Sequence, residues 1–421
     1  MTQIRRPRRS RCRLAAVAAL MAAVVGDAWA LPAATTPAAS SAASAADADA
    51  VHQAQVEARI LSTPRLFRGS DGLSHLAYEL RITSFQPEDD PLELVRVAVF
   101  QDGAAAPLRT FDGAEVAALR NRAAAPDDPK DGLPIASGRS ATLFLWLSLP
   151  PGVQPRSLRH QLAFRTAQGR IERADNVRTA VVAPAPLVIG PPLRGGRWLA
   201  VEGPGNPLSH HWGSPVAIDG RLTIPQRFAI DWFGLDDSGH SLHGRHDTLA
   251  ASVDEDWVGY GKDVLAVADG VVVDARDGVV SQGVLSPQEE PADLTARTLY
   301  GNFIVLRIAS GVYAHYAHLS TGSVNVRPGA RVRRGDVIGR LGQTGLAGAP
   351  HLHFQVSDLP TFEQSDGLPY AIDRFTRDGR TSLEETFDPD KPVELQARPG
   401  GGMPAARRNE LPLDGDVVTF P

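Results

Sequence analysis

The 421-residue sequence contains a single cysteine, Cys12. It lies among several arginines, ahead of an apolar run over residues 14–25 and the small-residue site Ala28-Trp29-Ala30. Basic, apolar and small residues in this order are typical of a secretory signal peptide, so residues 1–30 are predicted to be removed, and Cys12 with them. The mature chain would then lack thiols, which excludes disulfides and leaves His, Asp and Glu as the ligands for any zinc ion.

The sequence also lacks a second long apolar run and an excess of charge of one sign. Residues 14–25 are short for a transmembrane helix, and no later segment is long and apolar enough to span a bilayer. We therefore expect an exported protein of the periplasm or cell envelope, with no membrane contact after signal cleavage; an uncleaved signal anchor is the alternative. The 43 Lys and Arg and 48 Asp and Glu residues give a formal net charge of −5, which excludes a basic surface for nucleic acid.

A chain of this length exceeds one typical core, so more than one domain is expected. Residues 31–50 are almost wholly Ala, Ser, Thr, Pro and Asp, a composition typical of a flexible leader. Residues 51–182 hold short alternating apolar segments bounded by Gly, Pro or Asp, which predict an immunoglobulin-like β-sandwich with a spacer or binding role. A proline-rich linker is predicted over 183–196, a second β domain over 197–392 and a tail over 393–421, whose apolar end is expected to pack back on a domain.

Two histidines alternate on a predicted strand within the turn-rich stretch 345–357. His351 and His353 share one face of this strand, and a second predicted strand, residues 313–319, supplies His318. Neutral imidazole is a good zinc ligand, and a second imidazole beside it can act as an acid or a base. A lone His-X-His also occurs on ordinary surface strands, so the interpretation as a metal site depends on the third imidazole converging on the pair.

The apolar segment 227–233 carries an aspartate that is predicted to be buried. Alternation along a strand places its apolar side chains on one face and Arg227 and Asp231 on the other. A carboxylate inside an apolar strand needs a partner. Two interpretations remain open at this point: an ion pair between Asp231 and Arg227, or a metal ligand.

Several motifs, in this order, resemble those of the M23 family of metallopeptidases, the lysostaphin-type cell-wall endopeptidases. They are Val-Leu-Ala-Val-Ala-Asp-Gly-Val-Val (264–272), Tyr-Gly-Asn-Phe-Ile-Val-Leu (300–306), Tyr-Ala-His-Leu (316–319), residues 332–342 and His-Leu-His-Phe (351–354). The resemblance covers residues 227–358. It implies a compact, mainly antiparallel β domain with one zinc ion in a groove, which would hydrolyse the peptide cross-links of peptidoglycan.

The resemblance also implies roles for single residues. The family holds zinc with the His and Asp of a His-X-X-X-Asp motif and with the second His of His-X-His; here the Asp corresponds to Asp231 and the second His to His353. Its remaining histidines correspond to His318 and His351, which would polarise the attacking water and stabilise the oxyanion.

The sequence departs from the family pattern four residues before Asp231, where Arg227 stands in place of the first zinc-binding histidine. A guanidinium group stays protonated and has no lone pair for a metal. His210 or His211 would replace the missing ligand, and His210 is taken as the third predicted ligand. The His-X-X-X-Asp spacing of residues 243–247 is a further alternative, and without any replacement the site is degenerate.

Two functions therefore remain open. The first and main prediction is an exported zinc metalloendopeptidase that acts on peptidoglycan or another exported peptide. The second is a degenerate, non-catalytic module that binds the cell wall or activates a true hydrolase. Arg227 favours the second function, whereas the presence together of Asp231, His318, His351 and His353 favours the first.

Overall fold

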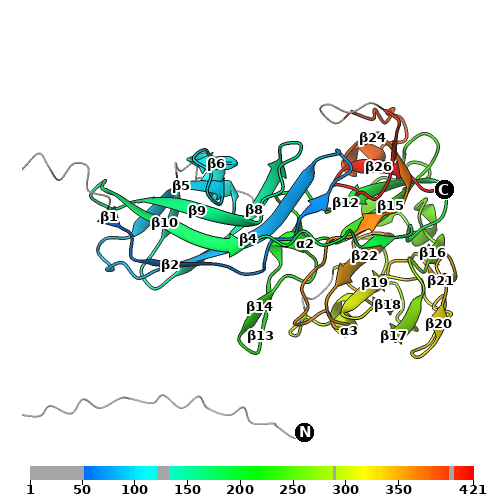
Figure 1. The fold of residues 1–421 in the computed structure, drawn as a ribbon. Helices are drawn as coiled ribbons and strands as arrows, with labels where there is room; N and C mark the ends of the chain where they lie inside the picture. Colours follow the sequence, from blue (N-terminus) through cyan, green and yellow to red (C-terminus); the bar gives the residue numbers. More distant parts are fainter. Residues whose placement is uncertain (1–51, 121–131, 288–290, 398–402) are drawn as a thin grey trace, which may run out of the picture. The chain divides into compact units, whose positions relative to one another are not determined.

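The computed structural model describes residues 52–120, 132–287, 291–397 and 403–421. The predicted signal peptide and leader, residues 1–50, lie outside the described residues. The described chain is almost entirely β-structure with a few short helices, so the prediction of a mainly β protein is confirmed (Figure 1). Within these residues, no helix has the length and apolar character needed to cross a membrane.

Two sheets pack on one apolar core in the N-terminal β region, residues 52–182. One sheet has the strand order β1-β10-β9-β5-β6, with β7 paired to β5, and the other has the order β2-β4-β3, with β8 paired to β4. The elements are β1 (His52–Gln53), β2 (Val56–Ile60), β3 (Phe67–Arg68), β4 (Ser74–Ser84), β5 (Leu92–Gln101), β6 (Arg109–Asp112), α1 (Ala114–Ala118), β7 (Leu133–Ile135), β8 (Ser140–Leu149), β9 (Ser157–Arg165) and β10 (Ile171–Ala180). The immunoglobulin-like character of this region stays a prediction.

Strand β4 is buried on both of its faces. Leu76, Tyr78 and Leu80 point into the core of the N-terminal β region. The alternate residue Ala77 belongs instead to a core that is shared with the second half of the chain. Because successive side chains of a strand point to opposite faces, β4 takes part in two cores at once.

The second half of the chain forms a ten-stranded antiparallel sheet with the order β20-β17-β18-β19-β22-β15-β12-β26-β24-β25. These strands are β12 (Arg197–Val201), β15 (Ile230–Leu235), β17 (Gly270–Arg276), β18 (Phe303–Ala309), β19 (Val312–Ala317), β20 (Arg331–Val332), β22 (Leu352–Ser357), β24 (Phe375–Arg380), β25 (Ala405–Arg407) and β26 (Asp416–Thr419). The segment predicted as a tail thus contributes β25 and β26, and its apolar end packs on the sheet as expected.

Smaller elements surround this sheet. They are β11 (Val188–Ile189) paired with β23 (Ala371–Ile372), β13 (Val216–Ile218) with β14 (Arg221–Thr223), β16 (Asp263–Leu265) with β21 (Val337–Arg340), and the helices α2 (His210–Gly213) and α3 (Ala296–Leu299). Among the described residues, turns of 3-10 helix lie at Leu249–Ala251, Asp254–Asp256 and Glu384–Thr386. The predicted linker therefore supplies one short strand, β11, while the domain boundaries as a whole stay predictions.

Strand register gathers the predicted site residues at the middle of the ten-stranded sheet. Asp231 in β15 lies directly opposite His353 in β22, and His353 lies opposite Ala317 in β19. His318 follows Ala317 at the end of β19. Side chains of directly opposed residues on neighbouring antiparallel strands are close neighbours, so three strands bring these groups together.

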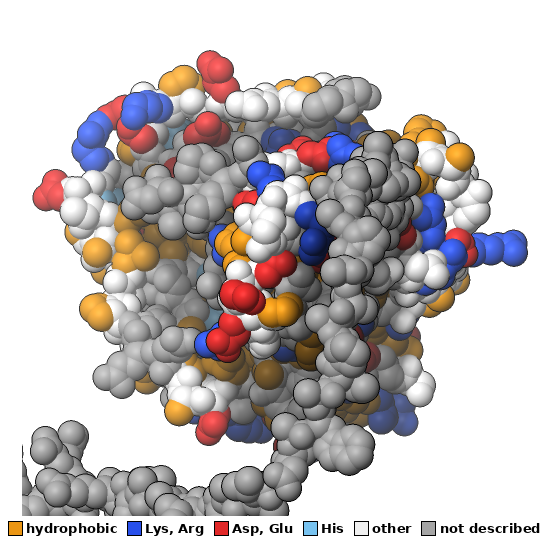
Figure 2. Space-filling model, turned by 90° about the vertical axis from the view of Figure 1, so that its left-hand side faces the viewer, with side chains coloured by type: hydrophobic (Ala, Val, Ile, Leu, Met, Phe, Trp, Pro, Cys, Tyr) orange, Lys and Arg blue, Asp and Glu red, His pale blue; other side chains and the backbone are white. Residues whose placement is uncertain are grey.

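Acidic and basic side chains are interspersed on the face of the molecule seen in Figure 2. The described side chains of that face do not gather into a patch of one sign, in keeping with a formal net charge of −5 for the whole chain. A surface of this kind gives little long-range attraction to a polyanion.

One buried histidine in the N-terminal β region predicts a loss of stability in acid. His160 is fully buried; its Nδ1 lies 3.0 Å from the Val177 carbonyl oxygen and its Nε2 lies 2.8 Å from the Tyr78 hydroxyl. Burial lowers the pKa of His160 to about 4. The folded protein therefore keeps this ring neutral while the unfolded chain takes up a proton below pH ~6.5, so stability is lost as pH falls from about 6.5 to 4.

We expect His160→Gln to lessen this acid sensitivity. The drop in unfolding free energy between pH 7 and pH 4 should be about 3 kcal/mol smaller in the variant than in the parent, since each pKa unit corresponds to ~1.4 kcal/mol. Urea unfolding at the two pH values measures the difference, and the exposed His52 provides the control substitution His52→Gln. An equal drop in parent and His160→Gln would contradict the prediction.

Candidate metal centre

Three imidazoles converge on one carboxylate oxygen, Oδ1 of Asp231. His353 Nδ1 lies 2.9 Å from this oxygen, while His211 Nε2 and His351 Nε2 each lie 3.4 Å from it. All four side chains are at most 9% exposed. A buried carboxylate without partners is costly, so this convergence needs either protonated histidines or a cation.

Two of these rings are oriented by backbone carbonyl groups. His211 Nδ1 lies 3.1 Å from the Glu202 carbonyl oxygen, and His351 Nδ1 lies 2.7 Å from the Ala349 carbonyl oxygen. A carbonyl oxygen only accepts, so each Nδ1 carries the proton and each Nε2 keeps its lone pair toward Asp231. Imidazole rings that bind metals are oriented in the same manner.

The His353 ring has the opposite orientation, with Nδ1 rather than Nε2 facing Asp231. Its Nε2 lies 2.9 Å from Gln355 Oε1, while the amide nitrogen of Gln355 donates to the Pro225 carbonyl oxygen at 3.2 Å. Because that bond directs Oε1 toward the ring, Nε2 of His353 carries the proton and Nδ1 faces Asp231 with a lone pair. Gln355 is two residues from His353 on the same strand face, which is the signal in the sequence that identifies it.

His318 lies beside the group without touching Asp231. Its Nδ1 donates to the Thr344 carbonyl oxygen at 2.8 Å, and its ring centroid lies 4.8 Å from that of His351. The backbone of His318 has φ +63°, a left-handed conformation that is rare outside glycine. Such conformations persist where the surrounding structure holds them, and they concentrate at functional sites.

Arg227 takes no part in this cluster. Its Nη2 donates to Glu79 Oε2 at 2.7 Å and its Nε donates to Glu79 Oε1 at 2.8 Å. The interpretation of Asp231 as the ion-pair partner of Arg227 is therefore wrong. Strand β15 begins only at Ile230, so Arg227 lies in the preceding turn, where strand alternation no longer sets the side-chain direction.

The two adjacent histidines of α2 differ in position. His211 is buried against Asp231, whereas the His210 side chain is 62% exposed and its Nδ1 lies 3.1 Å from Glu202 Oε2. One ligand atom from each of His210, His211 and Asp231 nevertheless lies within 4.8 Å of the others. Of these two histidines, only His211 is buried, with a ring nitrogen aimed at Asp231.

The alternative motif over residues 243–247 lies in a loop after β15. His246 Nε2 is 3.6 Å from Asp256 Oδ2 and 3.1 Å from the His243 carbonyl oxygen, and His243 itself is exposed. The His246 ring of this motif is thus held within its own loop, while Arg245 pairs with Asp390.

Burial and charge together set the protonation of the cluster. Burial lowers the pKa of His211 and of His318 well below its usual value. Burial acts on His351 in the same direction, but the Asp231 carboxylate outweighs it and raises the pKa of His351. Burial opposes ionisation of Asp231, yet its interactions with His211 and His351 keep its pKa well below the usual range. Without a bound cation, the cluster therefore combines an ionised carboxylate with a neutral His211 and with a His351 that favours its protonated form.

This donor set fits a divalent metal ion. Zinc takes imidazole nitrogen and carboxylate oxygen at about 2.0–2.2 Å, which places neighbouring ligand atoms roughly 3–4 Å apart. The distances from Asp231 Oδ1 to His353 Nδ1 and His211 Nε2, 2.9 Å and 3.4 Å, match that spacing. Three protein ligands leave a fourth position for water, the arrangement of catalytic zinc sites.

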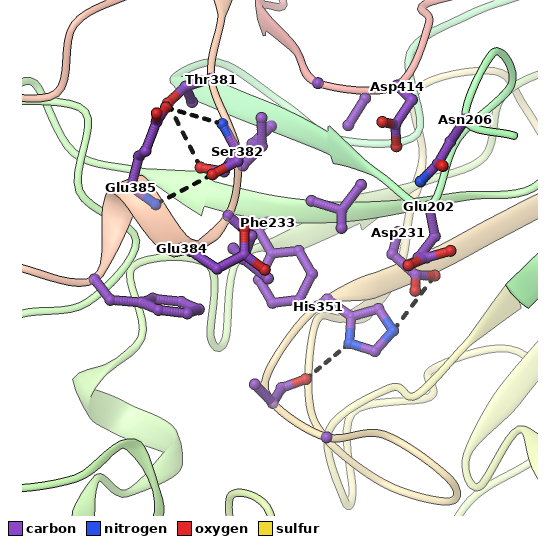
Figure 3. Close-up of a pocket in the computed structure, with 18 of the residues that line it drawn as sticks. Glu202, Asn206, Asp231, Phe233, His351, Thr381, Ser382, Glu384, Glu385 and Asp414 are labelled. Carbon is purple, nitrogen blue, oxygen red and sulfur yellow. Dashed lines mark hydrogen bonds and ion pairs between the residues drawn. The ribbon is translucent and has the colours of Figure 1, made fainter. Parts of the chain in front are cut away.

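Two cavities meet at Asp231 and His351. A cavity of about 320 Å³ is lined by all five of the buried site residues, Asp231, His211, His318, His351 and His353, together with His210 and Tyr300. A larger one of about 690 Å³ extends from Asp231 and His351 toward β24, as Figure 3 shows. Leu249 and Trp257, from the segment after β15, and Leu285, from the segment between β17 and α3, line this larger cavity.

Comparison with known proteins relates part of the chain to one family of peptidases. The model of peptidase family M23 matches residues 256–363, a range that contains His318, His351 and His353 and begins after Asp231. The chain is 42% identical over 72 residues to the DD-carboxypeptidase/endopeptidase Mpg of Neisseria meningitidis, covering 17% of this chain and 16% of that protein. It is 50% identical over 56 residues to the glycyl-glycine endopeptidase ALE-1 of Staphylococcus capitis, covering 13% of this chain and 15% of that protein.

The chain thus spans about a sixth of the length of the curated relatives it matches. Among solved structures, the catalytic domain of lysostaphin from Staphylococcus simulans aligns with 21% identity over 41% of this chain and 88% of that domain, with a TM-score of 0.22, which adds nothing to the assignment. The resemblance predicted from the sequence motifs is confirmed by the family match. Residues 256–363 of the chain thus match peptidase family M23.

Proposed function

We propose that the chain is an exported zinc metalloendopeptidase that hydrolyses peptide bonds of peptidoglycan. The observation that carries this proposal is the convergence of three oriented imidazole nitrogens on Asp231 Oδ1, at 2.9–3.4 Å, beside a cavity. The relatives that match part of this chain are named as a DD-carboxypeptidase/endopeptidase and a glycyl-glycine endopeptidase, which supports hydrolysis of peptide bonds. Peptidoglycan as the substrate class follows from the resemblance of the sequence motifs to lysostaphin-type endopeptidases.

We further propose Asp231, His353 and His211 as the zinc ligands. His211 takes the place that was assigned to His210 from the sequence, because its Nε2 is buried and faces Asp231 while the His210 ring is mostly exposed. With His211 in this position, Arg227 no longer favours the alternative of a degenerate module that binds the wall or activates another hydrolase.

The remaining two histidines are suited to move protons. A zinc ion bound here would act as a Lewis acid and lower the pKa of its water to about 7. His318 and His351 each keep an Nε2 lone pair, because each Nδ1 donates to a carbonyl oxygen. One Nε2 accepts the proton of the attacking water and later delivers it to the leaving amine, and the other, when protonated, donates to the oxyanion.

Substitution of each α2 histidine tests the choice of ligand. We expect His211→Ala to lose most of its zinc, since two protein ligands remain, while His210→Ala keeps about one zinc ion per chain. Metal content of the dialysed proteins, measured by atomic emission, gives the answer. The reverse pattern, with zinc lost only from His210→Ala, would return the third ligand to His210.

The hydrolase itself is tested with the purified chain from residue 31 onward. Zinc-loaded protein is expected to release soluble fragments from isolated peptidoglycan sacculi, with one new amino terminus for every peptide bond cut. Chelation should stop the release and added zinc should restore it. Intact sacculi after incubation with fully zinc-loaded protein would reject a peptidoglycan hydrolase and leave a binding module.

A further inference from the structure

The carboxylate of Glu79 lies in the N-terminal β region but faces the second half of the chain. It is on β4, among residues whose neighbours Tyr78 and Leu80 point into the N-terminal core, so its own side chain points to the opposite face. The Glu79 side chain is fully buried. Burying a carboxylate costs several kcal/mol unless charged and hydrogen-bonding partners compensate for the lost water.

Three hydrogen bonds supply that compensation, and their donors come from two segments next to the metal centre. Arg227 donates Nε to Glu79 Oε1 at 2.8 Å and Nη2 to Oε2 at 2.7 Å. Trp212 donates its indole Nε1 to Glu79 Oε1 at 2.7 Å. Arg227 precedes Asp231 by four residues, and Trp212 directly follows His211.

Helix α2 needs such an anchor. It has only four residues, His210–Gly213, and an isolated helix of that length is unstable in water. From the second half of the chain, the helix is held by the Ser209 cap and by Glu202, which accepts from the His210 backbone N–H and from His211 Nδ1. From the N-terminal β region it is held through the Trp212 ring, which lies 5.6 Å from Phe144 and 6.3 Å from Trp146, both on β8. The contacts that fix the direction of α2 therefore come from both halves of the chain.

We propose that Glu79 is a positioning residue for the metal centre. By accepting the hydrogen bond of Trp212 it orients α2, and α2 in turn holds His211 Nε2 at Asp231. The N-terminal β region is then a component of the metal site as well as a spacer. This inference rests on the proposed function, because it takes His211 as a zinc ligand.

The same arrangement explains the arginine that departs from the family pattern. A histidine at position 227 turned toward the metal would leave the buried Glu79 carboxylate without its cation. Arg227 neutralises Glu79 instead, with two parallel charged hydrogen bonds. The loss of the ligand at 227 and its supply by His211 are thus two consequences of one buried carboxylate.

Two charge-neutral double variants isolate the hydrogen bond to Trp212. Glu79→Gln with Arg227→Met removes both buried charges and keeps an amide oxygen for the indole. Glu79→Met with Arg227→Met removes the charges and the acceptor together. Removing both members of the pair avoids leaving one buried ion without a partner. Trp212→Phe, which keeps a six-membered ring near Phe144 and removes the indole N–H donor, is the third variant.

Zinc Kd, from competition with a chelator, and the visible absorption spectrum of the cobalt-substituted protein are the readouts. We expect the Gln/Met variant to stay within a few-fold of the parent. The Met/Met variant and Trp212→Phe should bind zinc ~10–100-fold more weakly, the effect of losing a partner that orients a ligand, with an altered cobalt spectrum. Thermal unfolding of each apo protein confirms that the folded state is being compared.

A matched control breaks another contact between the same regions. Arg68 on β3 donates to Glu410 at 2.9 Å and does not contact α2, so Arg68→Met should leave zinc affinity unchanged. Parent-like affinity and spectrum in both Met/Met and Trp212→Phe would overturn the role of Glu79 and leave the hydrolase proposal standing. A parent protein that binds no zinc would overturn both.

Discussion

His353→Ala is expected to reduce the zinc content of the purified protein to background. His353 supplies Nδ1 at 2.9 Å from Asp231 Oδ1, and Gln355 fixes that nitrogen as the lone-pair donor. Without it, two protein ligands remain, one fewer than catalytic zinc sites use. Atomic emission on dialysed protein measures the loss.

His318→Ala is the counterpart to His353→Ala. His318 makes no contact with Asp231 and donates Nδ1 to the Thr344 carbonyl oxygen, so its removal should leave the zinc content at one ion per chain. The rate of sacculus digestion should fall about 100-fold or more, the usual cost of losing a proton-transfer group or an oxyanion donor.

The exposed His243 provides a control for both substitutions, because His243→Ala removes an imidazole from the surface of the loop after β15. It should retain both zinc and activity. Stoichiometric zinc in His353→Ala would refute its assignment as a ligand, and undiminished digestion by His318→Ala would refute its role in proton transfer.

The second large effect is expected at a glycine, Gly301→Ala. Gly301 has φ +66°, and a Cβ there would lie 2.3 Å from the Thr344 carbonyl carbon and 2.4 Å from the Gly345 backbone nitrogen. Backbone at this distance cannot move aside without shifting the Thr344 carbonyl that orients His318. We expect a loss of ~4 kcal/mol or more in unfolding free energy, at the upper end of what single substitutions cause.

Gly311 is a matched control that separates the effect of the left-handed backbone conformation from the effect of the steric contact. It has the same φ of +66° in the turn between β18 and β19, but a Cβ there would meet nothing within 4 Å. Gly311→Ala should therefore lower the unfolding free energy only through the left-handed backbone conformation of an alanine, by about 1–2 kcal/mol. Urea unfolding compares the two, and similar losses in both variants would show that the steric contact at Gly301 is relieved at little cost.

Much of the site could be predicted because it depends on local patterns. His351 and His353 share a strand face, and Asp231 lies on a second apolar strand, so alternation alone predicted inward-facing side chains. The family motifs predicted the roles, which the present geometry supports. The pairing of Asp231 opposite His353 was not visible in either strand separately, since register depends on how distant segments align.

The proposed third ligand could not be predicted from a local pattern. His210 and His211 are adjacent and identical in type, and a four-residue helix carries no periodic pattern that distinguishes them. The predicted direction of the Arg227 side chain was wrong for a related reason: Arg227 lies in a turn three residues before β15 begins, where strand alternation does not apply. Trp212, next to His211, and Arg227 both donate to Glu79, which is more than 130 residues away in sequence.

Residue patterns within short segments were therefore sufficient for the mainly β class, the resemblance to family M23 and four residues that the fold brings together, because strand alternation and motif order are properties of the local chain. The burial of His211 beside Asp231, the pairing of Arg227 with Glu79 and the packing of β4 against the second half of the chain were decided by the folded protein alone. They follow from the need to compensate a buried carboxylate, and that need arises only after distant segments have packed and excluded water.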